Sequence, residues 1–203
     1  MASIEREFAE SLKARNAPPR DIAYAAANIP QEFWDVTRTE LEVTPKNKPV
    51  YDFVTDFVDN IHNRIAAGIG LTLIDAAKTG KTLFGCAIIK SAAIDPETMR
   101  REYRVQRINY DSIIEDFSHL RGEQDTYTEL RNGLIRTDIL FLDSISYTNP
   151  PGILLSIART RRDFRKSTIL ATSIPPVQLE QLRTKELFDI FKDINAQYTV
   201  NRK

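Results

Sequence analysis

The sequence holds little cysteine and no long apolar stretch, and each shortage excludes a class of protein. Cys86 is the single cysteine among 203 residues, which excludes disulfides within the chain and suits a reducing compartment such as the cytoplasm. No stretch approaches the roughly 18 apolar residues of a membrane-spanning helix. The opening MASIEREFAESLKARN is charged without an apolar centre, so we do not expect a secretory signal or an association with membranes.

An excess of charge of either sign is also lacking, since 28 Lys and Arg balance 28 Asp and Glu. Proteins that coat nucleic acid are often basic overall, so the bulk charge gives no support for strong DNA binding. The balanced total charge does not exclude a local basic patch on the surface. His62 and His119 lie apart from each other and from Cys86, so no metal cluster of these residue types is expected.

From residue 49 onward, apolar residues alternate between helical spacing and short continuous runs. The helical spacing predicts helices over 49–66, 81–93, 111–121 (capped by Asp111), 124–136 and 152–165, and a mainly helical segment over 176–196. The short runs predict strands over 69–74, 104–109, 139–142 and 167–172. This alternation predicts an α/β fold, a parallel sheet with helices on both faces.

The first 48 residues are the least core-like part of the chain. Short helices are predicted over 3–15 and 20–27, followed by an irregular, proline-punctuated segment. We therefore divide the chain into a helical extension, 1–48, and a main domain, 49–203. Phe8 and Leu12 share one face of the first helix, where they either anchor a partner protein or pack onto the main domain.

A turn between a predicted strand and a predicted helix carries the sequence Thr79-Gly80-Lys81-Thr82. A phosphate-binding P-loop needs backbone N–H groups at a helix N-terminus, a Lys that reaches the outer phosphates and a Thr that holds Mg²⁺. We expect residues 75 and 78–82 to hold ATP or ADP with Mg²⁺. The motif is incomplete because Asp75 replaces its first glycine, and an incidental helix N-terminus stays the alternative.

An acidic residue at the end of another predicted strand completes the predicted site. Residues 138–144 read DILFLDS, and Asp143 matches the aspartate that orients Mg²⁺ opposite the P-loop threonine. Ser144 follows where a general base is usual, and a hydroxyl cannot act as a base at neutral pH. The next strand ends at Thr172 and Ser173, which are either sensors of the outer phosphate or ordinary capping hydroxyls. We expect Thr82 to face Asp143 across the tips of adjacent parallel strands.

Basic residues gather at the end of the predicted helix 152–165. They are Arg159, Arg161, Arg162 and Arg165, followed by Lys166. Either they contact DNA phosphates or a neighbouring subunit, or they simply favour the negative end of the helix dipole.

Taken together, the sequence resembles the DnaC, DnaI and IstB group of AAA+ proteins from about residue 29 to 191. The resemblance is carried by Ile29-Pro30-Gln31-Glu32-Phe33, GLTLID…TGKT, Asn109-Tyr110-Asp111-Ser112-Ile113-Ile114, DILFLDS and KSTILATS, in the family's order. It implies a RecA-like domain with little or no lid. It also implies an N-terminal extension that binds a hexameric replicative helicase and delivers it to single-stranded DNA, or assistance to a transposase.

The departures from the family imply weak or lost hydrolysis. Asp75 stands for the first P-loop glycine, Ser144 for the acidic residue and Ser173 for the usual sensor Asn. Leu187 and Phe191 stand where the family's arginine fingers are expected. A compact, diverged copy of this kind would suit a bacteriophage replication gene, acting in a bacterial cytoplasm.

The leading hypothesis is a helicase-loading adaptor that uses ATP as a conformational switch and self-associates or touches single-stranded DNA. A pseudo-ATPase interaction module, an IstB-like transposase helper and a small P-loop kinase are the alternatives. In the kinase, the arginines between 159 and 165 would serve as a phosphate-gripping lid.

Overall fold

A computed structural model describes residues 2–36, 43–45, 47–75, 79–93, 103–120 and 122–199 of the chain. Five strands in this part form one sheet in the order β2-β3-β4-β1-β5, and every neighbouring pair is parallel. The strands are β1 (Leu71–Ile74), β2 (Val105–Asn109), β3 (Ile139–Ile145), β4 (Ser167–Thr172) and β5 (Ala196–Thr199). The predicted α/β class and parallel sheet are confirmed.

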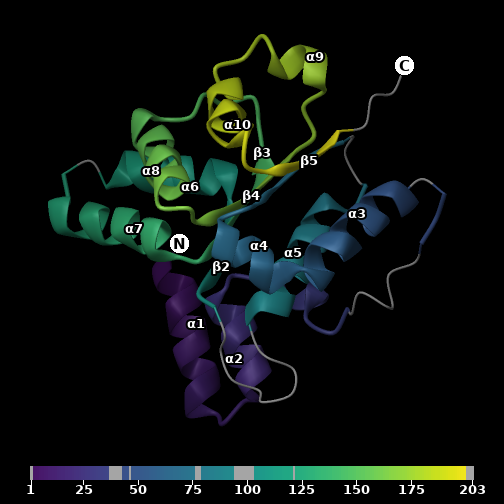
Figure 1. The fold of residues 1–203 in the computed structure, drawn as a ribbon. Coiled ribbons are helices and arrows are strands. Elements are labelled where there is room, and N and C mark those ends of the chain that lie inside the picture. The colour runs from purple at the N-terminus through teal and green to yellow at the C-terminus, as the bar shows by residue number, and fades with distance from the viewer. Residues whose placement is uncertain are drawn as a thin grey trace.

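Helices cover both faces of this sheet (Figure 1). One side holds α2 (Pro19–Ala26), α3 (Lys48–Asp59), α4 (Ile61–Ala67) and α5 (Lys81–Ala93). The other holds α6 (Tyr110–His119), α7 (Gln124–Arg136), α8 (Gly152–Asp163), α9 (Pro176–Leu179) and α10 (Lys185–Phe191). The strands alternate between the two cores: Phe141 packs with the first group and Leu142 with the second, because successive side chains point to opposite faces.

Among the described residues, every helix is too short or too polar to span a membrane.

The predicted helix over 49–66 is two helices. α3 ends at Asp59, Asn60 has non-helical backbone angles (φ −113°, ψ 20°), and α4 starts at Ile61. The Asn60 side chain donates to the carbonyl of Asp56 at 2.9 Å, a local bond that competes with the helical pattern. Gly68, with φ 72°, caps α4 in the left-handed region, which glycine adopts readily.

Three further predictions need correction. The segment over 176–196 is only partly helical, and it leads into the edge strand β5, whose mixed residues give no apolar run. β3 continues three residues past its predicted end at 142. The cap of α6 is Asn109 and not Asp111, because the Asn109 side chain accepts from the N–H groups of Asp111 and Ser112.

The N-terminal segment, with α1 (Ala2–Ala14), α2 and the short 3₁₀ helix η1 (Gln31–Phe33), packs onto the α5 side of the molecule (Figure 1). Its buried side chains in that core are Ala9, Tyr24, Ala25, Ala27, Ile29 and Trp34. The Ala27 carbonyl accepts the backbone N–H of Arg107 at 2.8 Å, on the outer edge of β2. On α5, Lys90 donates to the carbonyls of Phe33, Trp34 and Val36. The segment therefore contributes to the stability of the main domain.

Candidate functional site

β1 ends at Ile74 and α5 begins at Lys81, so the connection between them lies at the carboxyl edge of the sheet. β1 is an interior strand between β4 and β5, so the turn lies between a central strand and its helix, as predicted. In open α/β sheets, ligands bind outside the carboxyl ends of the strands. Asp75, Thr79 and Gly80 are described, whereas the predicted contact Lys78 lies outside the described residues.

Gly80 gives the turn the backbone shape that opens α5. Its φ of 86° lies in the left-handed region, which glycine adopts without the penalty that a Cβ imposes. The first N–H groups of an α-helix have no partner within the helix and favour an anion together with the helix dipole. The turn can therefore present backbone donors to a phosphate group.

Lys81, the first residue of α5, folds back over the turn. Its side chain is only 8% exposed, and Nζ donates to the Asp75 carbonyl at 2.9 Å and to Thr79 Oγ1 at 3.3 Å. Burial lowers the pKa of the Lys81 ammonium, against the opposing influence of the Asp75 and Asp143 carboxylates. A largely buried ammonium group at the start of a helix is a suitable partner for an anionic ligand such as a phosphate.

Thr82 and Asp143 meet, as predicted, since the Thr82 hydroxyl donates to Asp143 Oδ1 at 3.1 Å. Their strands are not adjacent, which corrects the prediction: β4 lies between β1 and β3. α5 bridges the gap because it packs across β2, β3 and β4. Gly85 permits this close crossing, since a Cβ there would lie 2.2 Å from the ring of Phe141 on β3.

Arg107 on β2 is a member of the site that sequence reasoning missed. Its Nε and Nη2 donate to Asp143 Oδ2 at 3.0 and 2.7 Å. The Arg107 side chain is 14% exposed and that of Asp143 only 1%, so water screens this ion pair poorly. The sequence did hold a signal, because Arg107 shares the face of β2 that carries the buried Val105.

These residues fit a phosphate group better than they fit a divalent ion. Gly80, Lys81 and the start of α5 supply donors and positive charge at one point. Asp143, by contrast, has Oδ1 engaged by Thr82, and its negative charge is already paired with the Arg107 guanidinium at Oδ2, which lowers its attraction for Mg²⁺ in this arrangement.

The residues at the positions expected to take part in hydrolysis, Ser144, Thr172 and Ser173, are not arranged as catalytic groups. Ser144 is exposed with a φ of 58°, beside an irregularity in the β3–β4 register, a strained backbone for a residue with a Cβ. Thr172 is buried, and its hydroxyl donates to the Ile145 carbonyl and accepts from the Ile174 N–H. Ser173 is exposed at the end of β4.

Leu187 and Phe191, where the resemblance implied arginine fingers, are both fully buried in the core of the second face. Their positions on α10 therefore face inward and stabilise the fold.

The prediction that Arg161 makes a surface contact is wrong. Its side chain is 0% exposed, and the guanidinium donates to the carbonyls of Leu134, Thr137 and Ser167 and to Thr168 Oγ1. It ties the ends of α7 and α8 to β4, so it cannot reach DNA or another subunit from this position.

The other three arginines of this group, Arg159, Arg162 and Arg165, are exposed. Arg162 pairs with the neighbouring Asp163, at 3.0 Å. These three remain candidates for a surface contact.

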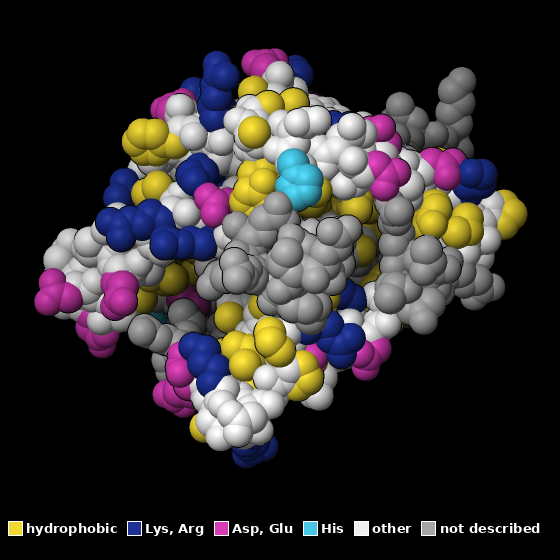
Figure 2. Space-filling view, turned by 60° about the horizontal axis from the view of Figure 1, so that its bottom comes forward, with side chains coloured by type: hydrophobic (Ala, Val, Ile, Leu, Met, Phe, Trp, Pro, Cys, Tyr) yellow, Lys and Arg dark blue, Asp and Glu magenta, His cyan; other side chains and the backbone are white. Residues whose placement is uncertain are grey.

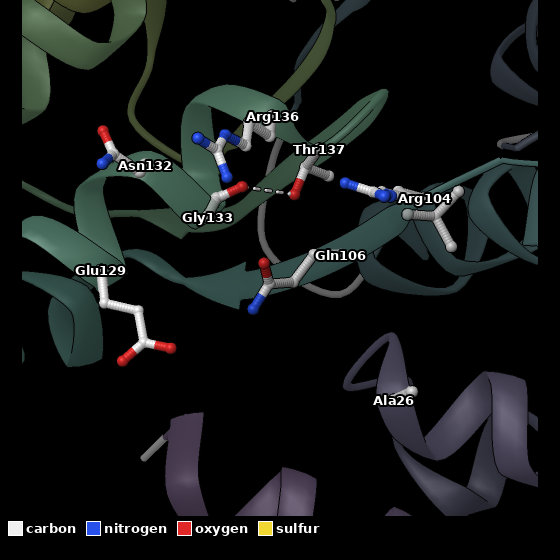
Figure 3. A pocket seen from close by; sticks show the side chains of 9 residues that line it. Ala26, Arg104, Gln106, Glu129, Asn132, Gly133, Arg136 and Thr137 are labelled. Atoms are coloured by element: carbon white, nitrogen blue, oxygen red, sulfur yellow. Dashed lines mark hydrogen bonds between the residues drawn. The ribbon is translucent and has the colours of Figure 1, made fainter.

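Basic residues also line two hollows at the amino edge of the sheet, away from the P-loop turn. One cavity of about 430 Å³ lies between α2, the start of β2 and the end of α7; Figure 3 shows Arg104 and Arg136 on its walls and Glu129 at its other end. The second, of about 510 Å³, adds Lys166 and the exposed ring of Phe164. Figure 2 shows Lys and Arg side chains gathered on the left, the side where Figure 1 places α7 and α8.

Phe8 and Leu12 on α1 behave differently from each other. Leu12 packs partly buried against the main core, whereas Phe8 stays 44% exposed with its ring centroid 6.3 Å from that of the buried Trp34. Phe8 is therefore the apolar side chain of this pair that a partner could cover.

Comparisons with known proteins place this geometry in context. No protein-family description matches the sequence, and no curated protein does. Among solved structures, the DnaC helicase loader is similar with a TM-score of 0.67 and 18% identity, covering 84% of this chain and 99% of that one. DnaI is similar with a TM-score of 0.66 and 14% identity, covering 85% of this chain and 94% of that one.

DnaA from Aquifex aeolicus, solved with bound AMPPCP, is similar with a TM-score of 0.61 and 20% identity. That match covers 83% of this chain but only 51% of the DnaA chain, so this chain spans about half of its length. The strand order and these likenesses together confirm the predicted fold, a RecA-like parallel α/β domain with the architecture of the solved DnaC and DnaI structures.

Proposed function

We propose that the chain is an ATP-binding adaptor of DNA replication that engages a hexameric replicative helicase and helps to place it on single-stranded DNA. The observation that carries this proposal is the buried Lys81 at the head of α5, beside the Thr82–Asp143 contact, in a chain that matches almost the full length of the solved DnaC loader. The cofactor we propose is ATP or ADP, and the place of action is the bacterial cytoplasm.

Nucleotide serves as a conformational ligand in this proposal, with little or no hydrolysis. Ser144 cannot polarise an attacking water, and Leu187 and Phe191 cannot stabilise charge on a transferred phosphoryl group. Occupation of the site by a phosphate would draw Lys81 from the Asp75 carbonyl, which couples binding to the position of Asp75 at the end of β1.

The helicase contact is proposed for the N-terminal segment, with Phe8 as an anchor. Deleting all of 1–48 is a poor test, because Tyr24, Ile29 and Trp34 belong to the core of the main domain. The better test is co-purification of the full chain with the hexameric helicase of its own system, comparing wild type with Phe8→Ala. Phe164→Ala is the matched control, an exposed aromatic removed from a different surface.

Loss of helicase binding with Phe8→Ala but not with Phe164→Ala supports the proposal. Failure of the wild-type chain to bind that helicase contradicts it.

Contacts with single-stranded DNA or with other copies of the chain are proposed for the basic surface around α7, α8 and the start of β2. Its exposed members are Arg104, Arg136, Arg159, Arg162 and Arg165. Each phosphate contact releases counterions, so DNA binding by this side would weaken steeply with salt.

A second candidate, an interaction module that binds no nucleotide, is favoured by the Arg107–Asp143 ion pair, which already neutralises the acidic residue of the site. Calorimetric titration with ATP separates the two. Heat that disappears in Lys81→Ala supports the adaptor, and no heat at any concentration supports the module.

A further inference from the structure

Asp143 is the most enclosed charge of the site, and both of its oxygens have partners. Oδ1 accepts the Thr82 hydroxyl at 3.1 Å, and Oδ2 accepts Nε and Nη2 of Arg107 at 3.0 and 2.7 Å. A carboxylate that is 1% exposed must be paired with a cation or with donors to stay ionised. Arg107 supplies that cation from within the chain.

The Arg107 side chain is held in place by its own strand. Its backbone N–H donates to the Ala27 carbonyl at 2.8 Å, which fixes β2 against the N-terminal segment. Its two nitrogens on one oxygen form charge-assisted bonds, which are roughly twice as strong as neutral ones. Drawing Asp143 away from this pair would leave a guanidinium that is 14% exposed without its counter-charge.

A divalent ion at a P-loop normally depends on two protein groups, the hydroxyl after the lysine and the acidic residue of the neighbouring strand end. The first is present as Thr82, whose oxygen keeps lone pairs while its hydrogen is donated to Asp143. The second is committed to Arg107. The positive charge beside Asp143 is therefore the single charge of the Arg107 guanidinium, which the protein itself supplies.

We propose that Arg107 takes the place of the divalent ion at Asp143, so that the site binds nucleotide phosphates with little dependence on Mg²⁺. This inference rests on the proposed nucleotide binding and deepens it. Gly80, Lys81 and the start of α5 hold the phosphates, and Arg107 keeps Asp143 neutralised whether or not a metal arrives with the nucleotide. Affinity then derives from the protein's own cations.

The test is fluorescence titration of the full chain with ADP and with ATP, in Mg²⁺ and in EDTA. For the wild type, the two affinities should agree within about threefold. Arg107→Gln exposes Asp143 to the metal, so its affinity in Mg²⁺ should exceed that in EDTA by about tenfold or more, equivalent to about 1.4 kcal/mol. Arg107→Lys keeps a cation and should stay near the wild type.

Arg131→Gln is the control, with the same loss of charge at a side chain on α7 that contacts Asn132 of its own helix. It should retain the wild-type ratio. A wild-type affinity that falls about tenfold or more in EDTA overturns the inference and leaves the proposed nucleotide binding intact. Absence of binding in both buffers overturns both. The wild-type ratio decides even if Arg107→Gln fails to fold.

Discussion

The Thr82 hydroxyl lies 3.1 Å from Asp143 Oδ1, although the two residues are 61 positions apart in the chain and their strands are not neighbours. The contact exists because α5 runs over β4 to β3, where Gly85 lets the helix lie against Phe141. The close packing of α5 on the sheet therefore brings the two residues of the site together.

Gly85→Ala should destabilise the fold by about 1–3 kcal/mol, because its Cβ would lie 2.2 Å from the Phe141 ring and force the helix outward. Gly133→Ala is the matched control in α7, where a Cβ meets nothing within 4 Å. It should leave stability unchanged or raise it by about 0.5–1 kcal/mol. Urea unfolding of both variants checks this; equal destabilisation by the two would argue against close packing of α5 on β3.

Arg161→Ala should cost about 3–5 kcal/mol of folding free energy or prevent folding, because it leaves carbonyls of α7 and β4 without their donor. Arg162→Ala should change stability by less than about 0.5 kcal/mol, since its side chain is exposed. Thermal unfolding compares the pair. Tolerance of Arg161→Ala with unchanged stability would contradict the structural role assigned to it.

Acid should weaken the fold partly through Asp138. Burial tends to raise the pKa of this carboxyl, but the bonds from Lys166 Nζ at 2.6 Å and the Arg104 N–H at 3.0 Å outweigh it and hold the pKa below its ordinary 3.8. The resulting stability is present above the unfolded-state pKa and is lost as pH falls through the lower, folded-state value.

Asp138→Asn removes this titration, so its urea midpoint should fall less than that of the wild type between about pH 5 and pH 2. Parallel curves for the two proteins would mean that the ion pair contributes nothing that depends on pH.

The exposed arginines predict a salt effect. If single-stranded DNA contacts Arg162 and Arg165, the slope of log affinity against log salt should become shallower by about 0.7 for each contact that is removed. Fluorescence anisotropy with the double variant Arg162→Ala and Arg165→Ala measures this slope. An unchanged slope and affinity would place the DNA contact elsewhere.

The sequence predicted the elements that rest on local pattern. Lys81 and Thr82 open the helix of a strand-turn-helix pattern, and Asp143 follows a short apolar run, so local pattern marks all three without knowledge of long-range contacts. The helix over 124–136 and the strand over 167–172 have the predicted bounds, because each is delimited by a clear change of apolar spacing.

The rest depends on tertiary contacts. The partner of Arg107, Asp143, is 36 positions away, so the strand pattern that places Arg107 on the face of Val105 does not reveal which carboxylate it contacts. The run of basic residues predicts that Arg161 is exposed like its neighbours, although helical spacing from Leu154 and Ala158 places it on the buried side of α8. β5 was missed because a short edge strand of mixed residues is fixed by pairing with β1.

The most direct test of the account is calorimetric titration of ATP into the wild-type chain and into Lys81→Ala. Loss of a buried, charge-assisted contact to phosphate removes about 1.5–3 kcal/mol, so affinity should fall about tenfold to a hundredfold. Lys13→Ala, an exposed lysine paired with Glu10 on α1, should bind as the wild type does. Equal affinities in the wild type and Lys81→Ala would contradict a phosphate site at the turn before α5.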